Sequence, residues 1–342
     1  MRAVLVPLDI DPAPAPAGSR LQLLSGSSMG TDWSAQLMLP SGPDAHPIDT
    51  LDAALRQELD QVVAQMSHWE PDSLLSRYNA APAGSWHALP PAFYEVIDYA
   101  LSVHADSAGA YDPAAGVLVN LWGFGPNLAS ARRYDQAGFY APDAQAVAQA
   151  LAQRARARLR LDHEGRRLLQ PGGAILDLSA VAKGHAVDRL ALCLERHGVR
   201  HYLVEIGGEL RGAGVKADGQ PWWVEIEGVP DAGPAAQAVV ALHGLAIATS
   251  GDYRRYFHQG GQRRPHTLDP RSGYPVSNEL ASVTVLAPSC MQADALSTAL
   301  TVLGPQAGLA FAAARGLAAR FLARRDGELV ESVSPAWRAL LQ

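Results

Sequence analysis

One face of a predicted helix carries side chains that could hold a metal ion. Apolar spacing predicts a helix over residues 290–302, and its polar side chains recur along the opposite face: Asp294, Ser297, Thr298 and Thr301. Asp294 and Thr298 stand one turn apart, so a carboxylate and a hydroxyl can reach the same point. Such hard oxygen donors suit Mg²⁺, which commonly shares its shell with a substrate phosphate. A purely structural role also fits, with Asp294 stabilising the helix N-terminus and Thr298 bonding back to a carbonyl.

A second segment could receive an anion. Residues 174–178 form an apolar run that predicts a strand, and Ser179 stands where the N-cap of a following helix belongs. Asp177 and Lys183 then lie at the strand-to-helix junction, where free N–H groups, the helix dipole and a cation favour negative charge. Taken alone, the segment fits a capped surface helix with an incidental lysine equally well.

A third segment, residues 266–275, is a turn-rich loop that begins with a histidine. Asp269-Pro-Arg-Ser-Gly273 has the composition of tight turns. His266 could therefore contact a phosphate or act as an acid or base, although a lone loop histidine is more often only a solvent-facing polar residue. The sequence contains no Gly-x-x-x-x-Gly-Lys-Ser/Thr loop, and Gly212-Ala-Gly-Val-Lys-Ala217 is not followed by the helix that a dinucleotide motif requires.

The elements that must position these segments are helices and strands. Helical spacing predicts helices over residues 51–66, 91–101, 143–153 and 290–302, and residues 118–126 look like a packed, turn-rich loop. Strands are predicted at 21–24, 32–39, 202–206, 222–227, 245–249 and 282–286, with a hairpin at 156–169. Because strands often follow one another without a helix between them, we expect an α+β fold with mainly antiparallel sheets and packed helices. Residues 1–20 are expected to form a flexible leader and residues 21–342 a single domain.

Composition narrows the class of protein. The chain has 342 residues, of which 48% are hydrophobic and 18% charged, with a net charge of −6 that argues against nucleic-acid binding. We find no apolar stretch near the roughly 18 residues of a membrane span. The first ten residues make a poor secretory signal, and Cys193 and Cys290 fall on predicted helices rather than in a disulfide framework. A cytoplasmic location is expected, or a periplasmic one if the N-terminus is trimmed.

Several short motifs follow one another between residues 29 and 304. They are Met29-Gly-Thr31; Met66-Ser-His-Trp-x-x-x-Ser73 with Leu75-Ser-Arg-Tyr-Asn79; Ala110-Tyr-Asp112 with Leu121-Trp-Gly-Phe-Gly125; Asp177-Leu-Ser-Ala-Val-Ala-Lys-Gly184 with Asp188; Ile206-Gly-Gly208; Ser250-Gly-Asp-Tyr253; His266-x-x-Asp-Pro-x-x-Gly-x-Pro275; and Ala293-Asp-Ala-Leu-Ser-Thr298. In this order they resemble the motifs of the FAD:protein FMN transferases, the ApbE family.

The resemblance implies an ApbE-like, T-fold-related architecture and an enzyme that cleaves the pyrophosphate of FAD with Mg²⁺. Such an enzyme places FMN on a Thr of a target flavoprotein and releases AMP. Matching positions imply an FAD site lined by Met29, Trp69, Ala110, Tyr111, Asp112, Asp177, Lys183 and Leu268. They also imply a metal held by the backbone carbonyl of Ala180 with Asp294 and Thr298, and three catalytic residues: His266, Lys183 and Asp294.

The chain departs from the family pattern at three points. Trp69 stands where some members have Tyr, which keeps an aromatic face for the flavin. Ser297 stands where some have a second Asp, so the number of metal ions is left open. Many members carry a signal and a lipid-bearing Cys. Neither is recognisable in this sequence, so the export of those members is not carried over to it.

Two other functions compete with flavin transfer. One is an FAD-binding protein without transfer, against which the combination of Asp294, Thr298 and Lys183 argues, since binding alone needs no Mg²⁺ cluster. The other is a metal-dependent FAD pyrophosphatase that gives FMN and AMP, since water can replace a Thr as the nucleophile. No Ser/His/Asp or Cys/His pairing is recognisable in the sequence, so the attacking group is expected to come from outside the chain.

Overall fold

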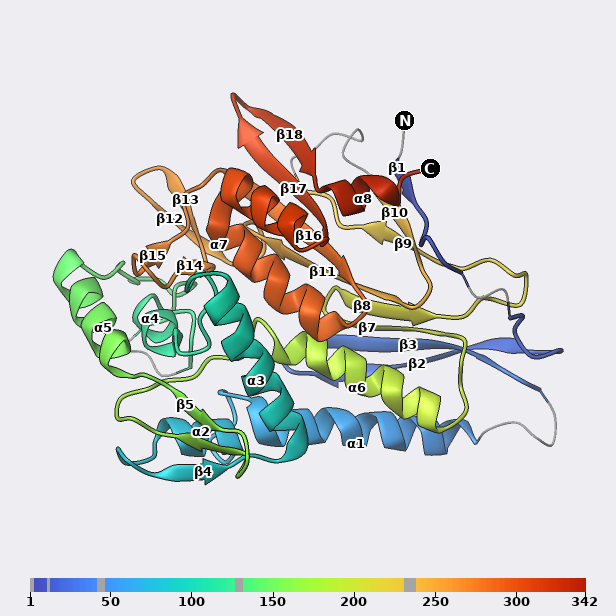
Figure 1. Ribbon diagram of the computed structural model, residues 1–342, viewed down its shortest axis with the longest axis horizontal. Coiled ribbons are helices and arrows are strands. Elements are labelled where there is room, and N and C mark those ends of the chain that lie inside the picture. Colours follow the sequence, from blue (N-terminus) through green and yellow to red (C-terminus); the bar gives the residue numbers. More distant parts are fainter. Residues whose placement is uncertain (1–2, 11–12, 42–46, 127–131, 231–237) are drawn as a thin grey trace.

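The computed structural model describes residues 3–10, 13–41, 47–126, 132–230 and 238–342. Within these residues the largest element is an eight-stranded sheet (Figure 1). Its strands run in the order β18 (Glu328–Val333), β17 (Ala318–Arg325), β16 (Leu280–Ala287), β11 (Leu245–Gly251), β8 (Glu209–Ala213), β7 (Tyr202–Ile206), β3 (Thr31–Leu39) and β2 (Arg20–Ser28). Every neighbouring pair is antiparallel, which confirms the predicted sheet type and the α+β class.

Helices cover one face of this sheet. In Figure 1 α6 (Ala182–Arg196) and α7 (Cys290–Ala314) lie in front of it, with α1 (Ile48–Met66) and α3 (Pro91–Asp106) beside them. The apolar side chains of α1 recur at helical spacing and are buried, namely Leu51, Leu55, Leu59 and Val62. They meet the inward residues of β3 and β7 in one large core, so the predicted helices at 51–66 and 91–101 are confirmed.

A smaller layer covers the opposite face of the sheet. It consists of β1 (Ala3–Leu5), β10 (Ala238–Leu242), β9 (Trp222–Ile226) and the short helix α8 (Pro335–Ala339). Because both faces are covered, β16 is buried at every position instead of alternating. Part of the predicted leader belongs to this layer, since Ala3–Leu5 pairs with β10 and Leu5 has no exposed surface. Residues 1–2 and 11–12 of that leader lie outside the described residues.

The remaining elements lie around these layers. The helices are α2 (Leu74–Asn79), α4 (Gly116–Leu121) and α5 (Ala144–Arg156). The strands are β4 (Trp86–Ala88), β5 (Arg160–Asp162), β6 (Arg167–Leu169), β12 (Tyr256–Gln259), β13 (Gln262–Pro265), β14 (Leu268–Asp269) and β15 (Tyr274–Pro275). The predicted helix at 143–153 is confirmed as α5, capped by the Asp143 carboxylate, which accepts the N–H of Ala146 at 2.8 Å. The predicted hairpin is confirmed as β5 and β6.

The predicted strand over residues 174–178 is wrong. The segment is irregular, and side chains replace the strand partner that its sequence pattern suggests. The amide of Asn79 donates to the carbonyl of Leu176 at 3.0 Å and accepts its N–H at 2.8 Å. The side-chain amide of Gln170 likewise donates to the carbonyl of Ala174 and accepts its N–H. These hydrogen bonds satisfy the buried backbone groups without a neighbouring strand. The apolar pattern of such a segment is the same as that of a short strand, so the sequence cannot distinguish the two.

The predicted N-cap at Ser179 is also wrong. Its hydroxyl donates to the Asp177 carboxylate, which also accepts the Ser179 N–H at 2.8 Å. A tight turn follows, and the helix begins only at Ala182, with no capping side chain at Val181. The local bond from Ser179 to Asp177 therefore replaces the cap that the sequence pattern suggested.

The segment predicted as a packed loop, residues 118–126, begins inside helix α4. Gly116 starts this helix against the carbonyl of Ile175, to which it donates at 3.0 Å, and a Cβ there would lie only 2.6 Å from that oxygen. The Trp122 indole donates to the carbonyl of Gly273 at 2.7 Å. Tertiary packing therefore outweighs the turn-forming composition of the segment.

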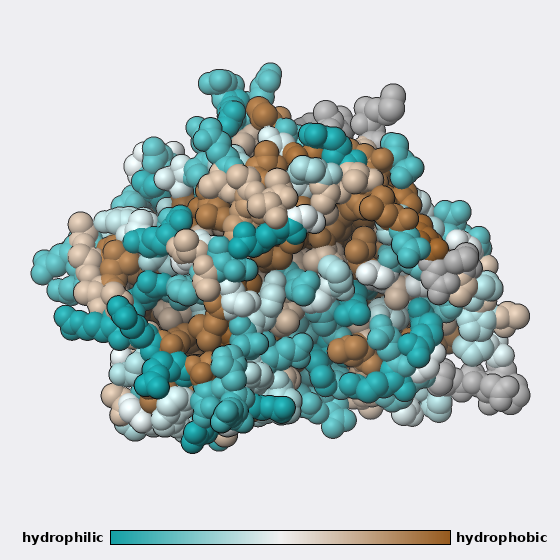
Figure 2. All heavy atoms as spheres, viewed as in Figure 1, coloured by the Kyte–Doolittle hydropathy of each residue, from teal (hydrophilic) through white to brown (hydrophobic). Residues whose placement is uncertain are grey.

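Helix α7 is longer than predicted. Gly304, with φ of 81°, breaks the regular helix at the expected place, but Pro305 begins a second helical run and the whole extends over 25 residues. By length and composition it could cross a membrane, contrary to the sequence-based expectation, but 56% of its apolar window is buried within the fold. It packs on α6, β11 and β16, and Figure 2 shows apolar side chains gathered over it on this face.

The two cysteines lie inside α6 and α7. Cys193 and Cys290 are both buried free thiols, so the prediction that neither belongs to a disulfide framework is confirmed.

Asp188 joins α6 to the start of α7, and its loss should destabilise the whole domain. Its buried carboxylate accepts bonds from Arg211 (2.8 Å), the Ser289 hydroxyl (2.9 Å) and the N–H groups of Cys290 and Met291 (both 2.9 Å). Asp188→Asn removes the charge and turns an amide donor toward these donors. We expect the free energy of unfolding in urea to fall by about 3 kcal/mol.

Asp52→Asn is the matched control, since Asp52 pairs on the surface with Arg56 one turn away. That variant should change the unfolding free energy far less, because exposed helix pairs contribute little. Equal losses in the two variants would contradict the role given to Asp188.

Candidate active site

A cavity of about 470 Å³ lies where the helices meet the ends of the central strands. Its volume falls in the range of roughly 300–1,000 Å³ typical of small-molecule sites. Every residue that the sequence assigned to the FAD, metal or catalytic set lines this one cavity: Met29, Trp69, Ala110, Tyr111, Asp112, Asp177, Ala180, Lys183, His266, Leu268, Asp294 and Thr298. The structure thus brings the predicted residues together, while their roles stay predictions.

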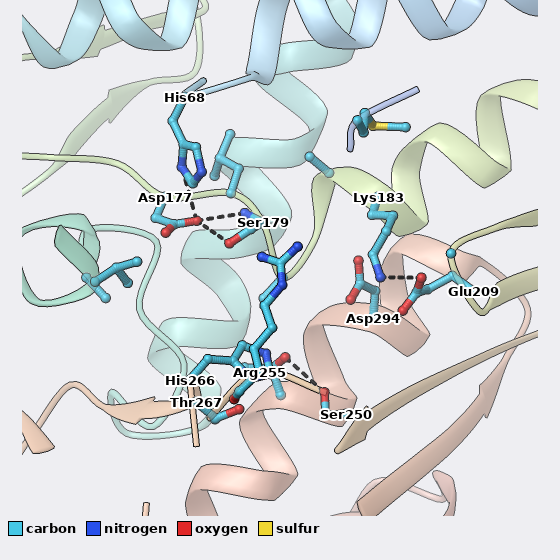
Figure 3. A pocket seen from close by; sticks show the side chains of 18 of the residues that line it. His68, Asp177, Ser179, Lys183, Glu209, Ser250, Arg255, His266, Thr267 and Asp294 are labelled. Atoms are coloured by element: carbon cyan, nitrogen blue, oxygen red, sulfur yellow. Dashed lines mark hydrogen bonds and ion pairs between the residues drawn. The ribbon is translucent and has the colours of Figure 1, made fainter. Parts of the chain in front are cut away.

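The loop after α1 supplies an aromatic wall. Ser73 caps α2, and its hydroxyl donates to the Ser67 carbonyl at 2.5 Å, which fixes the loop between them. Trp69 of this loop is 46% exposed and lines the cavity, and the guanidinium of Arg133 lies over its ring, 5.0 Å from the centroid. His68 lies beside it, with Nδ1 3.5 Å from the Asp177 carboxylate. Figure 3 shows His68 pointing toward Asp177.

A close approach of two helices creates the acidic wall. Gly184 of α6 has no side chain, and a Cβ there would lie 2.3 Å from the carbonyl oxygen of Cys290. Its N–H donates to the Asp294 carboxylate of α7 at 2.9 Å. One turn later, the Thr298 hydroxyl lies 3.2 Å from that of Ser250. Only with glycine at position 184 can the two helices pack this closely, so the glycine sets the position of Asp294.

Ser297 lies next to this wall but is not part of the cavity lining. Its side chain is 1% exposed and its hydroxyl donates to the Asp294 carbonyl at 2.9 Å. It also lies 2.8 Å from the Ser250 hydroxyl. Ser297 stands where some family members have a second Asp, and here its hydroxyl already has two hydrogen-bond partners within the protein.

Two buried carboxylates share one ammonium group in this wall. Lys183 donates to the carboxylate of Glu209, which is 4% exposed. Burial raises the pKa of Glu209 to about 7, although the Lys183 charge opposes the shift. Burial also raises the pKa of Asp294, again against the effect of Lys183. One ammonium group thus faces two buried carboxylates, and a further cation beside them would favour the ionised form of both.

These residues fit a magnesium ion. Among the described residues no cluster of three or more His, Cys, Asp or Glu side chains forms a protein-only metal cage. The available donors are hard oxygens: the Asp294 carboxylate, the Thr298 hydroxyl and the Ala180 carbonyl. Mg²⁺ is commonly held by one or two carboxylates, with water and substrate phosphate completing its shell. The two buried carboxylates beside Lys183 favour the same ion.

His266 faces the cavity as a neutral imidazole. Its Nδ1–H donates to the carbonyl of Arg255 at 3.1 Å, and Phe124 contacts the ring edge. Burial lowers the pKa of His266 to about 4, and the charges of Arg255 and Lys183 act in the same direction. Since Nδ1 donates to a carbonyl, a neutral ring leaves Nε2 free to accept a proton.

The segment containing Ala110, Tyr111 and Asp112 forms a rigid part of the lining. The Asp112 carboxylate accepts bonds from Arg154 and from the N–H of Ala114, so protein groups already occupy it. Tyr111 is 3% exposed, and burial raises the pKa of its hydroxyl well above the usual value. All three residues line the cavity, as predicted. The Asp112 carboxylate, however, is already hydrogen-bonded to protein groups.

Sequence reasoning missed three charged residues of the cavity. Glu209 directly follows the recognised Gly-Gly pair, but nothing in the sequence indicated that it would face Lys183. Arg254 follows the Ser250–Tyr253 motif and donates to the carbonyl of Gly207 at 2.7 Å. Arg255 comes next, and Figure 3 shows its guanidinium directed into the cavity. The sequence shows these two arginines, but it does not show that their side chains face the cavity.

The comparisons with known proteins agree with this architecture. Residues 29–321 match the model of the ApbE family. The FAD:protein FMN transferase of Klebsiella pneumoniae (strain 342) is 36% identical, over 96% of this chain and 91% of that protein. The protein of the same name from Vibrio cholerae serotype O1 is 37% identical, over 93% and 92%.

Solved structures give the same result. The apo form of Pseudomonas stutzeri flavinyl transferase ApbE is 38% identical and superposes with a TM-score of 0.83, covering 94% of this chain and 97% of that one. The flavin transferase ApbE from Vibrio cholerae is 33% identical, with a TM-score of 0.84 and coverage of 94% and 100%. The expected ApbE-like fold is confirmed, and the chain belongs to the ApbE family.

Proposed function

We propose that this chain transfers FMN from FAD to a threonine of an acceptor flavoprotein, in a Mg²⁺-dependent reaction that releases AMP. The names of its relatives, FAD:protein FMN transferase, support the class of reaction. The observation that carries the proposal is the cavity, where Asp294, Lys183 and a neutral His266 come from separate elements and line one space.

The proposed bond changes balance without any further reactant. The acceptor Thr oxygen forms a bond to the phosphorus of the FMN half, the pyrophosphate P–O bond breaks, and AMP leaves with that oxygen. His266 accepts the threonine proton at Nε2. Bound Mg²⁺, held by Asp294, Thr298 and the Ala180 carbonyl, would neutralise charge on the phosphoryl oxygens. Lys183 lies beside this group and orients the same oxygens.

The flavin is placed at the aromatic wall. Trp69 offers a ring face, and Met29 and Leu268 supply apolar lining. Met29 occupies the β2–β3 turn with φ of 52°, so this turn holds the residue at the cavity edge. An isoalloxazine ring on Trp69 would leave the phosphates directed toward Lys183 and His266.

The attacking hydroxyl is assigned to the partner protein. Among the described residues of the lining, no hydroxyl is hydrogen-bonded to either His68 or His266. The described lining therefore offers no nucleophile activated by a histidine, which favours an external threonine. Water could take the same place, and the pyrophosphatase is the alternative that the experiments below distinguish.

Removal of the metal ligand should abolish transfer. Asp294→Asn keeps an oxygen for the Gly184 N–H but lacks the negative charge, whereas alanine would leave that buried N–H without its acceptor. We expect flavin transfer at millimolar Mg²⁺ to fall by at least about 100-fold, because metal coordination is worth several kcal/mol in the transition state. Fluorescence of the flavinylated acceptor in a gel gives the rate, and a melting curve checks the fold. Full activity of this variant would remove Asp294 from the metal site.

His266→Gln should lower kcat by about 10²- to 10⁴-fold with little change in the Kd for FAD, as loss of a general base does. Because the pKa of His266 is lowered to about 4, the neutral ring persists as pH falls from 8 to about 5.5. The pH profile of the wild-type rate should therefore show no histidine transition near pH 6.5, and the profile of the variant should have the same shape over this range. A higher Kd with unchanged kcat would instead assign His266 to pyrophosphate binding.

Release of AMP should depend on the acceptor. A docked threonine has a far higher effective concentration at the phosphorus than a correctly placed water. Chromatography should show slow AMP release from FAD alone, a strong rise with an acceptor domain, and a return to the slow rate when its threonine is replaced by valine. Equal rates in all three mixtures would identify the chain as a pyrophosphatase.

A further inference from the structure

Arg255 presents an uncommitted cation to the cavity. It lies in the connection between β11 and β12, its side chain is exposed, and it lines the cavity. Among the described residues, its guanidinium has no hydrogen bond or ion pair. Figure 3 shows it extending from its loop toward the loop that carries Ser179.

The rest of this loop is held by protein contacts. Asp252 pairs with Arg324 and lies 3.5 Å from Arg263. Arg254 pairs with Glu227 and donates to a carbonyl of the neighbouring turn. These contacts fix the loop just before Arg255, and Tyr256 directly after it pairs with Pro265 in the β12–β13 hairpin, so the free guanidinium does not result from a loose segment.

The backbone of Arg255 is fixed to the proposed catalytic histidine. Its carbonyl accepts the N–H of His266 at 2.9 Å and the ring Nδ1–H at 3.1 Å. Arg255 and Lys183 line the same cavity as His266, and burial and then both charges lower the pKa of the imidazole. An anion held by Arg255 would therefore lie near the reacting atoms.

The other cations of the cavity already have partners. Lys183 pairs with Glu209, and Arg254 pairs with Glu227. Across the space, the Asp177 carboxylate already accepts two bonds from Ser179. A ligand bearing two phosphates thus needs a further cation, and Arg255 supplies one with the planar pair of donors that suits phosphate oxygens.

We propose that Arg255 binds the pyrophosphate of FAD and makes this site select phosphorylated flavins over riboflavin. The proposal rests on the proposed function and adds a residue to it. Arg255 acts as a specificity-determining residue, because its contact distinguishes ligands by phosphate and not by the flavin ring. Its exposed position also suits a carboxylate of the acceptor protein, and the experiment must separate these two ligands.

Arg255→Gln tests the assignment through binding alone. Quenching of flavin fluorescence gives the Kd values for FAD, FMN and riboflavin with Mg²⁺ present. We expect the Kd for FAD to rise about tenfold or more, that for riboflavin to stay unchanged, and Arg255→Lys to restore only part of the loss. The affinity of the wild type for FAD should also fall more steeply with added salt than that of the variant.

Arg325→Gln is the matched control, since it removes the same charge from an exposed strand end outside the cavity. All three Kd values should stay unchanged in this variant. An Arg255→Gln variant that binds FAD as the wild type does would overturn the assignment, as would equal losses for FAD and riboflavin. A raised KM for the acceptor with an unchanged Kd for FAD would overturn it in favour of a partner carboxylate. If the wild type itself does not bind FAD, the proposed function fails first.

Discussion

The contact between α6 and α7 at Gly184 is the constraint on which the site depends. A side chain at this position would meet the carbonyl of Cys290, so the two helices can approach only over a glycine. The approach lets the Gly184 N–H bind Asp294, while Asp188 one turn later binds the first N–H groups of α7. Two carboxylates are thus fixed by backbone donors, and the helix pair acts as one rigid support for the acidic wall.

Charge gives the cavity its chemical character. Asp294 and Glu209 lie beside a single ammonium group, and burial raises the pKa of both carboxylates against the opposing effect of Lys183. A divalent cation would favour their ionised forms, and donors too few for a protein-only cage fit magnesium when a phosphate completes its shell. On the other side, His266 is kept neutral by burial and by two nearby cations. An acidic wall therefore faces a neutral histidine across the cavity.

The same loop serves both structure and recognition. The connection between β11 and β12 holds His266 through the carbonyl of Arg255, while its other charged residues pair with the surrounding strands. The backbone of a loop fixed in this way does not have to be ordered when a ligand binds. Its one free guanidinium can therefore bind a ligand at little cost in conformational entropy. In the proposed function, phosphate recognition and the placement of the base would therefore both depend on one short segment.

The sequence alone determined which residues form the site, because ordered motifs from Met29 to Thr298 carried the family resemblance. It also indicated the antiparallel sheet and the main helices, whose apolar periods are long enough to be read directly. Only tertiary structure decided the rest. Residues 174–178 pair with Asn79 and Gln170 instead of a strand, and Glu209 and Arg255 reach the cavity through sheet geometry. Side-chain partners far apart in sequence leave no periodic signal, so the folded chain alone shows which charges are paired and which stay free.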